Sequence, residues 1–207
     1  MKRRLAASAK FLSLLESKSR VFNTRTLAAL WGLKAQSAKV EACRLVKSGV
    51  LVPLRRGWYC VAEREPDDLE LANALYQPSV ISLETALNYW GMLVQVPQIV
   101  TSIADRSRRF VVRGTEFTYR RVPPLLLTVG TVKENGCIMA GPEKSVLDYL
   151  YFGLKGGGRI GRGSLSLDRK VDLEKARRYL MCYPPAWRQR LLGEAARLMK
   201  RGYRGIR

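Results

Sequence analysis

The sequence has 207 residues, of which 37 are basic and 17 acidic, and its formal net charge at pH 7 is +20. An excess of this size favours partners with dense negative charge, namely nucleic acid or an anionic membrane surface. Histidine is absent, which removes the commonest general base and the commonest metal ligand and argues against most hydrolase chemistry.

The positive charge is concentrated at the two ends of the sequence. Residues 1–62 contain 13 basic and 2 acidic side chains, and residues 155–207 contain 15 and 4, so each end has a net charge of +11. The middle, residues 63–154, contains 9 and 11 and has a net charge of −2. Length and apolar content suit one moderate core or two small ones, and we expect the latter. We predict an α+β protein with domains at 1–62 and 67–207, separated by the polar stretch Glu63 to Asp68.

Metal, cofactor and membrane sites are not expected. Cysteines 43, 60, 137 and 182 are far apart and form no CxxC pair, so we expect reduced thiols. The opening segment is a poor signal peptide because Lys10 interrupts its apolar run and no small-residue cleavage pattern follows. No stretch approaches the roughly 20 apolar residues of a membrane span. We therefore predict a cytoplasmic protein without cofactor, metal or membrane partner.

The first domain begins with two predicted helices. The first is indicated by apolar residues at helical spacing, namely Leu5, Ala9, Leu12 and Leu15. The second is expected to be capped by Thr24 and to end at Gly32. Its apolar side consists of Leu27, Ala28 and Leu30.

A third helix is predicted after a tight turn, with Ser37 as its cap and Ser48 and Gly49 at its end. Its inward face is formed by Ala38, Ala42, Leu45 and Val46. Its outward face then contains Lys39, Val40, Cys43, Arg44 and Lys47. Gln36 and Ser37 lie at its N-terminus, where recognition helices usually contact base edges.

A hairpin follows the third helix. Residues 50–54 and 58–61 are the predicted strands, and Arg55, Arg56 and Gly57 form the turn. Helices followed by an arginine-tipped hairpin are typical of a winged helix-turn-helix domain, which binds double-stranded DNA through a recognition helix and phosphate contacts. The predicted DNA-binding residues are Lys34, Gln36, Ser37, Lys39, Val40, Arg44, Arg55 and Arg56. The alternative is a solvated helix face and a solvated turn.

The second domain is predicted to be mixed α/β. Asp67 or Asp68 caps a helix that runs to Tyr76, and a further helix begins at Ser82 and ends at Gly91. Five strand-like runs, bounded by turns at Gly114 and Gly136, predict a small, mostly antiparallel sheet. The runs are Gln98 to Ala104, Phe110 to Arg113, Phe117 to Val122, Leu125 to Val129 and Cys137 to Ala140.

A helix is predicted from Pro142 to about Leu154, because proline and glutamate favour a first helical turn. Its buried side consists of Val146, Leu147, Leu150 and Tyr151. We interpret Glu143, Lys144 and Asp148 as helix capping and surface polarity rather than as a catalytic group.

The C-terminal part contains a glycine-rich segment and two basic helices. Residues 155–167 are predicted to be a loop, and they lack the Gly-Lys-Ser/Thr ending of a nucleotide-binding P-loop. Helices are predicted over 172–183 and 186–201, separated by Pro184 and Pro185. Their basic residues form either a solvated face or a second surface for DNA, RNA or an acidic protein. These residues are Arg177, Arg178, Arg188, Arg190, Arg197, Lys200 and Arg201.

Several blocks of the sequence resemble the AbiEi family of antitoxins, from abortive-infection toxin–antitoxin systems of type IV. FNTRTLAALWGL and SAKVEACRLVKSGVLVPLRRGWYCV are similar to the winged-helix domain of that family. LELANALY, SVISLETALNYWGML and IMAGPEKSVLDYLY recur in the same order. Where the family often has Tyr-His-Gly, this sequence has Tyr89, Trp90 and Gly91. The resemblance covers most of residues 11–154.

The resemblance implies a division of labour between the domains. The N-terminal domain would repress its own operon promoter, and the C-terminal domain would counteract a co-encoded nucleotidyltransferase-like toxin without forming a stable complex with it. Such a protein would serve in phage defence. One alternative is a transcriptional regulator without a toxin partner. Another is a nucleic-acid-processing enzyme with metal ligands among Asp105, Glu116, Glu143 and Asp148. The operator and the oligomeric state stay open.

Overall fold

A computed structural model describes the backbone of residues 2–156, 165 and 171–202, and the side chains of residues 9–156, 165 and 171–198. The predicted loop at 155–167 lies largely outside the described residues. The side chains of Leu5, Lys200 and Arg201 also lie outside them.

The chain divides into two compact units, Met1–Ala74 and Leu75–Arg207. The division falls inside helix α4 (Asp68–Leu75), which follows the predicted boundary at Glu63 to Asp68. Asp67 accepts a hydrogen bond from the Glu70 amide at 2.8 Å, and Glu70 accepts one from the Asp67 amide at 3.2 Å. This reciprocal pair caps the helix.

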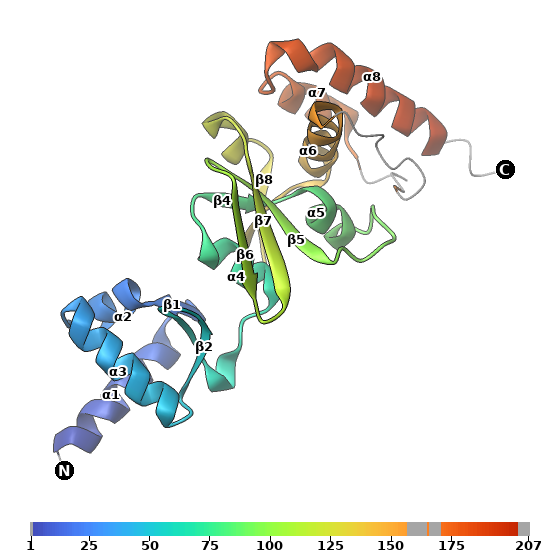
Figure 1. The fold of residues 1–207 in the computed structure, drawn as a ribbon. Helices are drawn as coiled ribbons and strands as arrows, with labels where there is room; N and C mark the ends of the chain where they lie inside the picture. Colours follow the sequence, from blue (N-terminus) through green and yellow to red (C-terminus); the bar gives the residue numbers. More distant parts are fainter. Residues whose placement is uncertain (1, 157–164, 166–170, 203–207) are drawn as a thin grey trace. The chain divides into compact units, whose positions relative to one another are not determined.

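The first unit combines helices with a small antiparallel sheet (Figure 1). Its elements before α4 are α1 (Lys2–Glu16), β1 (Val21–Asn23), α2 (Thr24–Trp31), α3 (Ala35–Lys47), β2 (Leu51–Arg55), β3 (Trp58–Val61) and the short 3-10 helix η1 (Ala62–Arg64). The strands lie in the order β1-β3-β2. Three buried residues from α1, β1 and α2, namely Leu14, Phe22 and Leu27, pack with the inner face of α3.

Local contacts set where these helices begin and end. Asn23, not Thr24, caps α2: its side chain accepts from the Thr26 amide, and the Thr26 hydroxyl accepts from the Asn23 amide at 2.8 Å. Gly32 ends α2 with φ 62°, a conformation that glycine adopts without strain. The predicted cap at Ser37 is wrong, because α3 already begins at Ala35.

The apolar stripe predicted for α1 is also partly wrong. Leu12 is 54% exposed, whereas Leu14 is buried in the core of the unit. Phe11 and Leu15 flank Leu14 and pack partly against the same core.

The second unit is built on a six-stranded mixed sheet in the order β6-β7-β5-β4-β9-β8. Its strands are β4 (Ser79–Ile81), β5 (Ile99–Ala104), β6 (Arg108–Val112), β7 (Thr115–Arg121), β8 (Thr131–Glu134) and β9 (Cys137–Ala140). Pairs β4–β5, β6–β7 and β8–β9 are antiparallel, whereas β4–β9 and β5–β7 are parallel. The sheet is therefore mixed, with three of its five strand pairs antiparallel.

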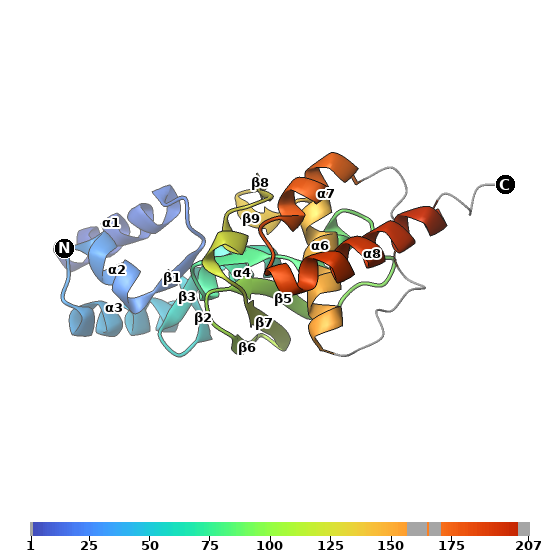
Figure 2. The ribbon, with the colours of Figure 1, turned by 90° about the horizontal axis from the view of Figure 1, so that it is seen from above.

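The helices of this unit pack around one apolar core (Figure 2). They are α5 (Leu83–Tyr89), α6 (Pro142–Lys155), α7 (Leu173–Leu180), α8 (Pro185–Gly202) and the short 3-10 helix η2 (Pro124–Leu127). Val80, Ile103 and Ala140 extend from three strands into the core. There they meet α5 and α6, and α7 and α8 pack against α6.

Four of the five predicted strands form: Cys137 to Ala140 has the predicted ends and three others are shifted, whereas Leu125 to Val129 is not a strand. Pro123 and Pro124 start the 3-10 helix η2 there, because their fixed φ angles suit a helical turn. Strands β1, β4 and β8 were not predicted. In the part of the chain that the structure describes, no helix has the length and apolarity needed to cross a membrane.

Candidate nucleic-acid interface

Helix α3 has one buried and one exposed face. Ala38, Ala42 and Leu45 are buried, so the predicted inward face is confirmed at these positions, whereas Val46 is half-buried. The residues on the opposite side are exposed, namely Gln36, Ser37, Lys39, Val40, Cys43, Arg44 and Lys47. Small alanines let the helix sit close to the core while its long polar side chains extend outward.

The exposed face of α3 forms a shallow hollow of about 310 Å³. The described residues that line it are Gln36, Lys39, Val40, Cys43, Arg44 and Lys47. The acidic residue of this helix, Glu41, is paired with Lys10 at 3.1 Å and with Arg44 at 3.3 Å. With the charge of Glu41 offset in this way, the outer face is electropositive and offers both donors and an apolar contact at Val40.

The N-terminus of α3 adds to this positive character. Lys34, Gln36 and Ser37 are all exposed there, and the Lys34 side chain makes no cap hydrogen bond. Free amides at a helix N-terminus and the helix dipole favour nearby negative charge. This end of α3 is therefore suited to a phosphate or to an acceptor on a base edge.

The two arginines of the β2–β3 hairpin have different environments. The Arg55 guanidinium lies 4.9 Å from the centre of the Trp58 ring, and Arg55 is half-buried. Arg56 is exposed at the turn. Stacking on an indole holds a guanidinium in place. Arg55 is thus oriented by the hairpin, whereas Arg56 extends freely from it.

The hairpin turn is anchored to the start of α2. The Gly57 carbonyl accepts a hydrogen bond from the Thr24 amide at 3.0 Å and one from the Thr24 hydroxyl at 3.3 Å. Gly57 has φ +76°, and a Cβ at this position would lie 3.2 Å from the Thr24 hydroxyl oxygen. Arg25, which sequence reasoning did not select, is exposed in the first turn of α2. The hydrogen bonds of Thr24 to the Gly57 carbonyl bring this turn of α2 to the hairpin, and local sequence patterns do not show a contact between residues 33 positions apart.

The basic residues of α7 and α8 have separate local contacts. Arg177 pairs with Glu174 at 3.4 Å, and Arg197 pairs with Glu194 at 2.7 Å. The Arg188 side chain donates to the Tyr183 carbonyl at 2.8 Å and is half-buried, so it braces the chain between the two helices. The Arg190 guanidinium lies 5.9 Å from the centre of the Trp187 ring. Arg178 is exposed.

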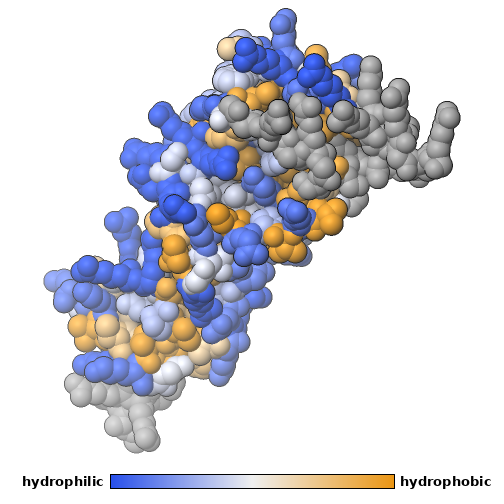
Figure 3. Space-filling view, turned by 45° about the vertical axis from the view of Figure 1, so that its right-hand side comes forward, coloured by the Kyte–Doolittle hydropathy of each residue, from blue (hydrophilic) through white to orange (hydrophobic). Residues whose placement is uncertain are grey.

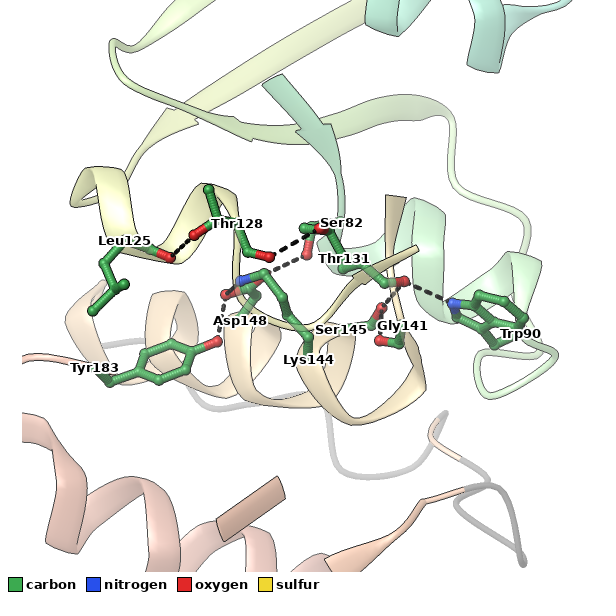
Figure 4. A network of polar contacts seen from close by, with 11 residues as sticks. Ser82, Trp90, Leu125, Thr128, Thr131, Gly141, Lys144, Ser145, Asp148 and Tyr183 are labelled. Carbon is green, nitrogen blue, oxygen red and sulfur yellow. Dashed lines mark hydrogen bonds and ion pairs between the residues drawn. The ribbon is translucent and has the colours of Figure 1, made fainter. Parts of the chain in front are cut away.

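A buried polar cluster in the second unit corrects the interpretation of three residues (Figure 4). Glu143, Lys144 and Asp148 are 7%, 1% and 0% exposed, so they are not surface polarity. Lys144 Nζ lies 3.0 Å from Asp148 Oδ2. Ser82 donates to the same oxygen at 2.6 Å, and Tyr183 donates to Asp148 Oδ1 at 2.5 Å. A charge is tolerated in a core when it is paired and hydrogen-bonded in this way.

The cluster joins elements that are distant in sequence. Ser82 precedes α5, Lys144 and Asp148 lie on α6, and Tyr183 follows α7. Glu143 joins a fourth contact nearby: its Oε1 accepts a hydrogen bond from the Asp172 amide at 2.9 Å, at the cap of α7. These bonds fix how α5, α6 and α7 pack against one another.

Tyr183 makes the stability of the second unit depend on pH in the alkaline range. Burial, and next the negative charge of Asp148, raise the pKa of Tyr183 well above 10.0. The unfolded chain therefore loses this proton at lower pH than the folded chain, and stability falls as pH rises above 10. We expect the wild-type unfolding free energy to decline there more steeply than that of Tyr183→Phe, by up to about 1.4 kcal/mol per pH unit. Parallel denaturant titrations of the two proteins between pH 8 and 11 would measure this, and identical slopes would contradict it.

The four carboxylates considered as metal ligands each have another contact. Asp105 accepts a hydrogen bond from the Tyr76 hydroxyl at 2.7 Å. A hydrogen bond from Arg109 lowers the pKa of the Glu116 carboxyl. Glu143 and Asp148 belong to the buried contacts of α6. Within the described residues, no group of three or more histidine, cysteine, aspartate or glutamate side chains is arranged to hold a metal ion.

Comparison with models of known protein families finds no match for this chain, and a search of curated proteins finds no similar protein.

Proposed function

We propose that the first unit is a winged helix-turn-helix domain and that the chain is an autoregulatory DNA-binding antitoxin. In this proposal α2 and α3 are the helical pair, and β2 and β3 form the wing. The observation that carries it is the exposed face of α3, where Lys39 and Arg44 lie beside Val40 and opposite a fully buried alanine face. A helix with this arrangement can enter a major groove without unpacking its own core.

The proposed binding mode assigns a role to each part of the interface. Residues Gln36 to Arg44 of α3 enter the major groove, where Arg44 contacts a base edge and Lys39 contacts phosphate. Arg56 contacts the phosphate backbone beside the groove, and Arg55 does so from its position on Trp58. The net charge of +11 over residues 1–62 supplies general attraction to the duplex.

The antitoxin half of the proposal is supported by the resemblance to the AbiEi family. The second unit would counteract a nucleotidyltransferase-like toxin encoded alongside, through the toxin's target or the modification it makes. Expressing the neighbouring reading frame with and without this chain tests it: growth should stop with the toxin alone and recover with both. Absence of such a reading frame would favour a plain transcriptional regulator. Metal-dependent cleavage of labelled DNA or RNA by the purified protein would favour the enzyme alternative.

The contribution of α3 is tested by Arg44→Ala. The Arg44 side chain is 64% exposed, and its ion pair with Glu41 is weak enough to be exchanged for a contact with DNA. If Arg44 makes a bidentate contact with guanine, its loss costs about 1 to 3 kcal/mol and relaxes selectivity for the operator. Lys39→Ala should instead weaken operator and scrambled DNA alike. Titrating both variants against the two duplexes measures this.

Lys133→Ala, in the second unit, serves as a control that removes one exposed charge outside the interface. We expect it to change the ratio of operator to scrambled affinity by less than about twofold. An Arg44→Ala protein with full operator affinity and full selectivity would remove Arg44 from the proposed interface.

A further inference from the structure

Arginine residues gather at one edge of the sheet in the second unit. Residues 63–154 have a net charge of −2, yet six of their nine basic residues are arginines between positions 106 and 121. They lie on or beside strands β6 and β7, namely Arg106, Arg108, Arg109, Arg113, Arg120 and Arg121. In Figure 3, hydrophilic side chains cover much of the face shown, and hydrophobic patches lie between them.

Three of these arginines meet at one corner of the sheet, and we name Arg106, Arg108 and Arg121 the corner cluster. Arg106 lies in the turn between β5 and β6, Arg108 begins β6, and Arg121 ends β7. The Arg121 amide donates to the Ser107 hydroxyl oxygen at 3.3 Å, which joins the end of β7 to the start of β6. All three side chains are exposed. The arginines therefore form a local concentration of positive charge at this corner.

The surroundings of the corner cluster leave it with a net positive charge. Asp105 is the acidic residue next to it in the sequence, and its carboxylate, which accepts a hydrogen bond from the Tyr76 hydroxyl, offsets one of the three positive charges. The Arg108 guanidinium lies 5.7 Å from the centre of the Tyr76 ring, which orients it without neutralising it. By contrast, Arg109 is paired with Glu116 on the other face of the hairpin, and Arg120 lies over the Phe152 ring.

Protection of the sheet edge does not account for the whole cluster. Charged residues on an edge strand discourage pairing with another chain, and β6 is an edge strand. That explanation covers Arg108 and Arg109. It does not cover Arg121, which is paired with Ala104 of β5 on one side and whose amide donates to the Ser107 hydroxyl on the other, and it does not cover Arg106 in the turn.

We propose that the corner cluster is a second DNA contact, which binds the phosphates of a duplex without reading sequence. Guanidinium groups bind phosphate oxygens in a bidentate manner. Contacts with phosphates do not require an element to enter a groove, so the corner of a six-stranded sheet can make them. Binding of single strands usually adds stacking on exposed aromatic rings, but Phe117 and Tyr119 of β7 are buried. The inference rests on the proposed function only in taking DNA as the ligand.

The test uses the full chain, with Arg106, Arg108 and Arg121 all changed to Gln, and a duplex of random sequence. The affinity falls as salt rises, and each lost phosphate contact reduces the magnitude of the slope of log K against log salt concentration by about 0.9. The wild type should therefore lose about fortyfold more affinity than the variant between 50 and 200 mM salt. The matched control changes Lys133, Lys155 and Lys175 to Gln, removes the same charge from exposed positions, and should keep the wild-type slope. Changing the three arginines to Lys should also keep it.

Folding and the alternative ligands are checked in the same series. Because Arg106 lies in a turn, the single substitution Arg106→Gln should leave the melting temperature unchanged. It should reduce the magnitude of the salt slope by about 0.9. The inference would be overturned if the variant with three arginines changed to Gln had the same salt slope as the control with three lysines changed to Gln. A larger loss on an RNA duplex than on DNA would overturn it in favour of RNA. Operator selectivity is scored separately through Arg44, so failure of the winged-helix proposal and failure of the corner cluster give different results.

Discussion

Replacing Asp148 with alanine is expected to lower the unfolding free energy of the second unit by about 3 to 5 kcal/mol. The substitution leaves the Lys144 ammonium buried without its carboxylate partner. It also removes the acceptor of the Ser82 and Tyr183 hydroxyls. An uncompensated charge in an apolar core costs far more than the net value of the pair. Amide hydrogen exchange over α6 in a denaturant series would measure the change in this unit alone.

The matched control changes Lys144 to Met and Asp148 to Leu together. This pair removes both charges while keeping apolar volume, so it should recover the part of the loss that comes from the unpaired lysine. The Ser82 and Tyr183 hydroxyls still lack their acceptor in it, so the double variant should stay less stable than the wild type. A single variant as stable as the wild type would contradict the account. So would a double variant that is less stable than the single one, because the loss would then come from packing rather than from the unpaired lysine.

The second large effect is expected for Phe22→Ala in the first unit. Phe22 is 3% exposed in β1 and packs in the core formed with α1, α2 and α3. Removing a buried phenyl ring costs about 3 to 5 kcal/mol through lost apolar contact and the cavity left behind. Amides of α2 and α3 should therefore exchange far faster, while those of α6 keep their protection because the second unit has its own core.

Leu30→Ala is the control for this substitution, since Leu30 lies on α2 but is 39% exposed. It should cost less than about 1 kcal/mol. Equal exchange in the Phe22 and Leu30 variants would contradict the placement of Phe22 in the core. Equal loss of protection in α3 and α6 after Phe22→Ala would contradict separate cores.

Features set by neighbouring residues were predictable from the sequence. The inward face of α3 follows from Ala38, Ala42 and Leu45, which lie within one helix and need no other segment to specify them. The hairpin turn at Arg56 and Gly57 follows from residue types suited to a tight turn. The start of α2 was missed by one residue because Asn23 and Thr24 are both good caps. The pairing of Asn23 with Trp58 decides between them by ending β1 at Asn23.

Features that depend on distant segments were not predictable in this way. Asp148 is 66 residues from Ser82 and 35 from Tyr183, so helical spacing alone gave no sign that α6 buries its charges. The corner cluster could not be predicted from the sequence for a related reason. A net charge of −2 over residues 63–154 does not show which side chains the strands bring together. The six-stranded order, which mixes parallel and antiparallel neighbours, places Arg106 beside Arg121.

The most direct test of the central proposal is binding of the purified chain to its own upstream DNA and to a scrambled duplex over several salt concentrations. With a net charge of +20, some affinity for any duplex is expected at low salt. The winged-helix proposal predicts that the upstream DNA stays bound at physiological salt after the scrambled duplex is released, and that Arg44→Ala reduces this difference. Equal affinity for both duplexes at every salt concentration would contradict it and leave only charge-driven binding.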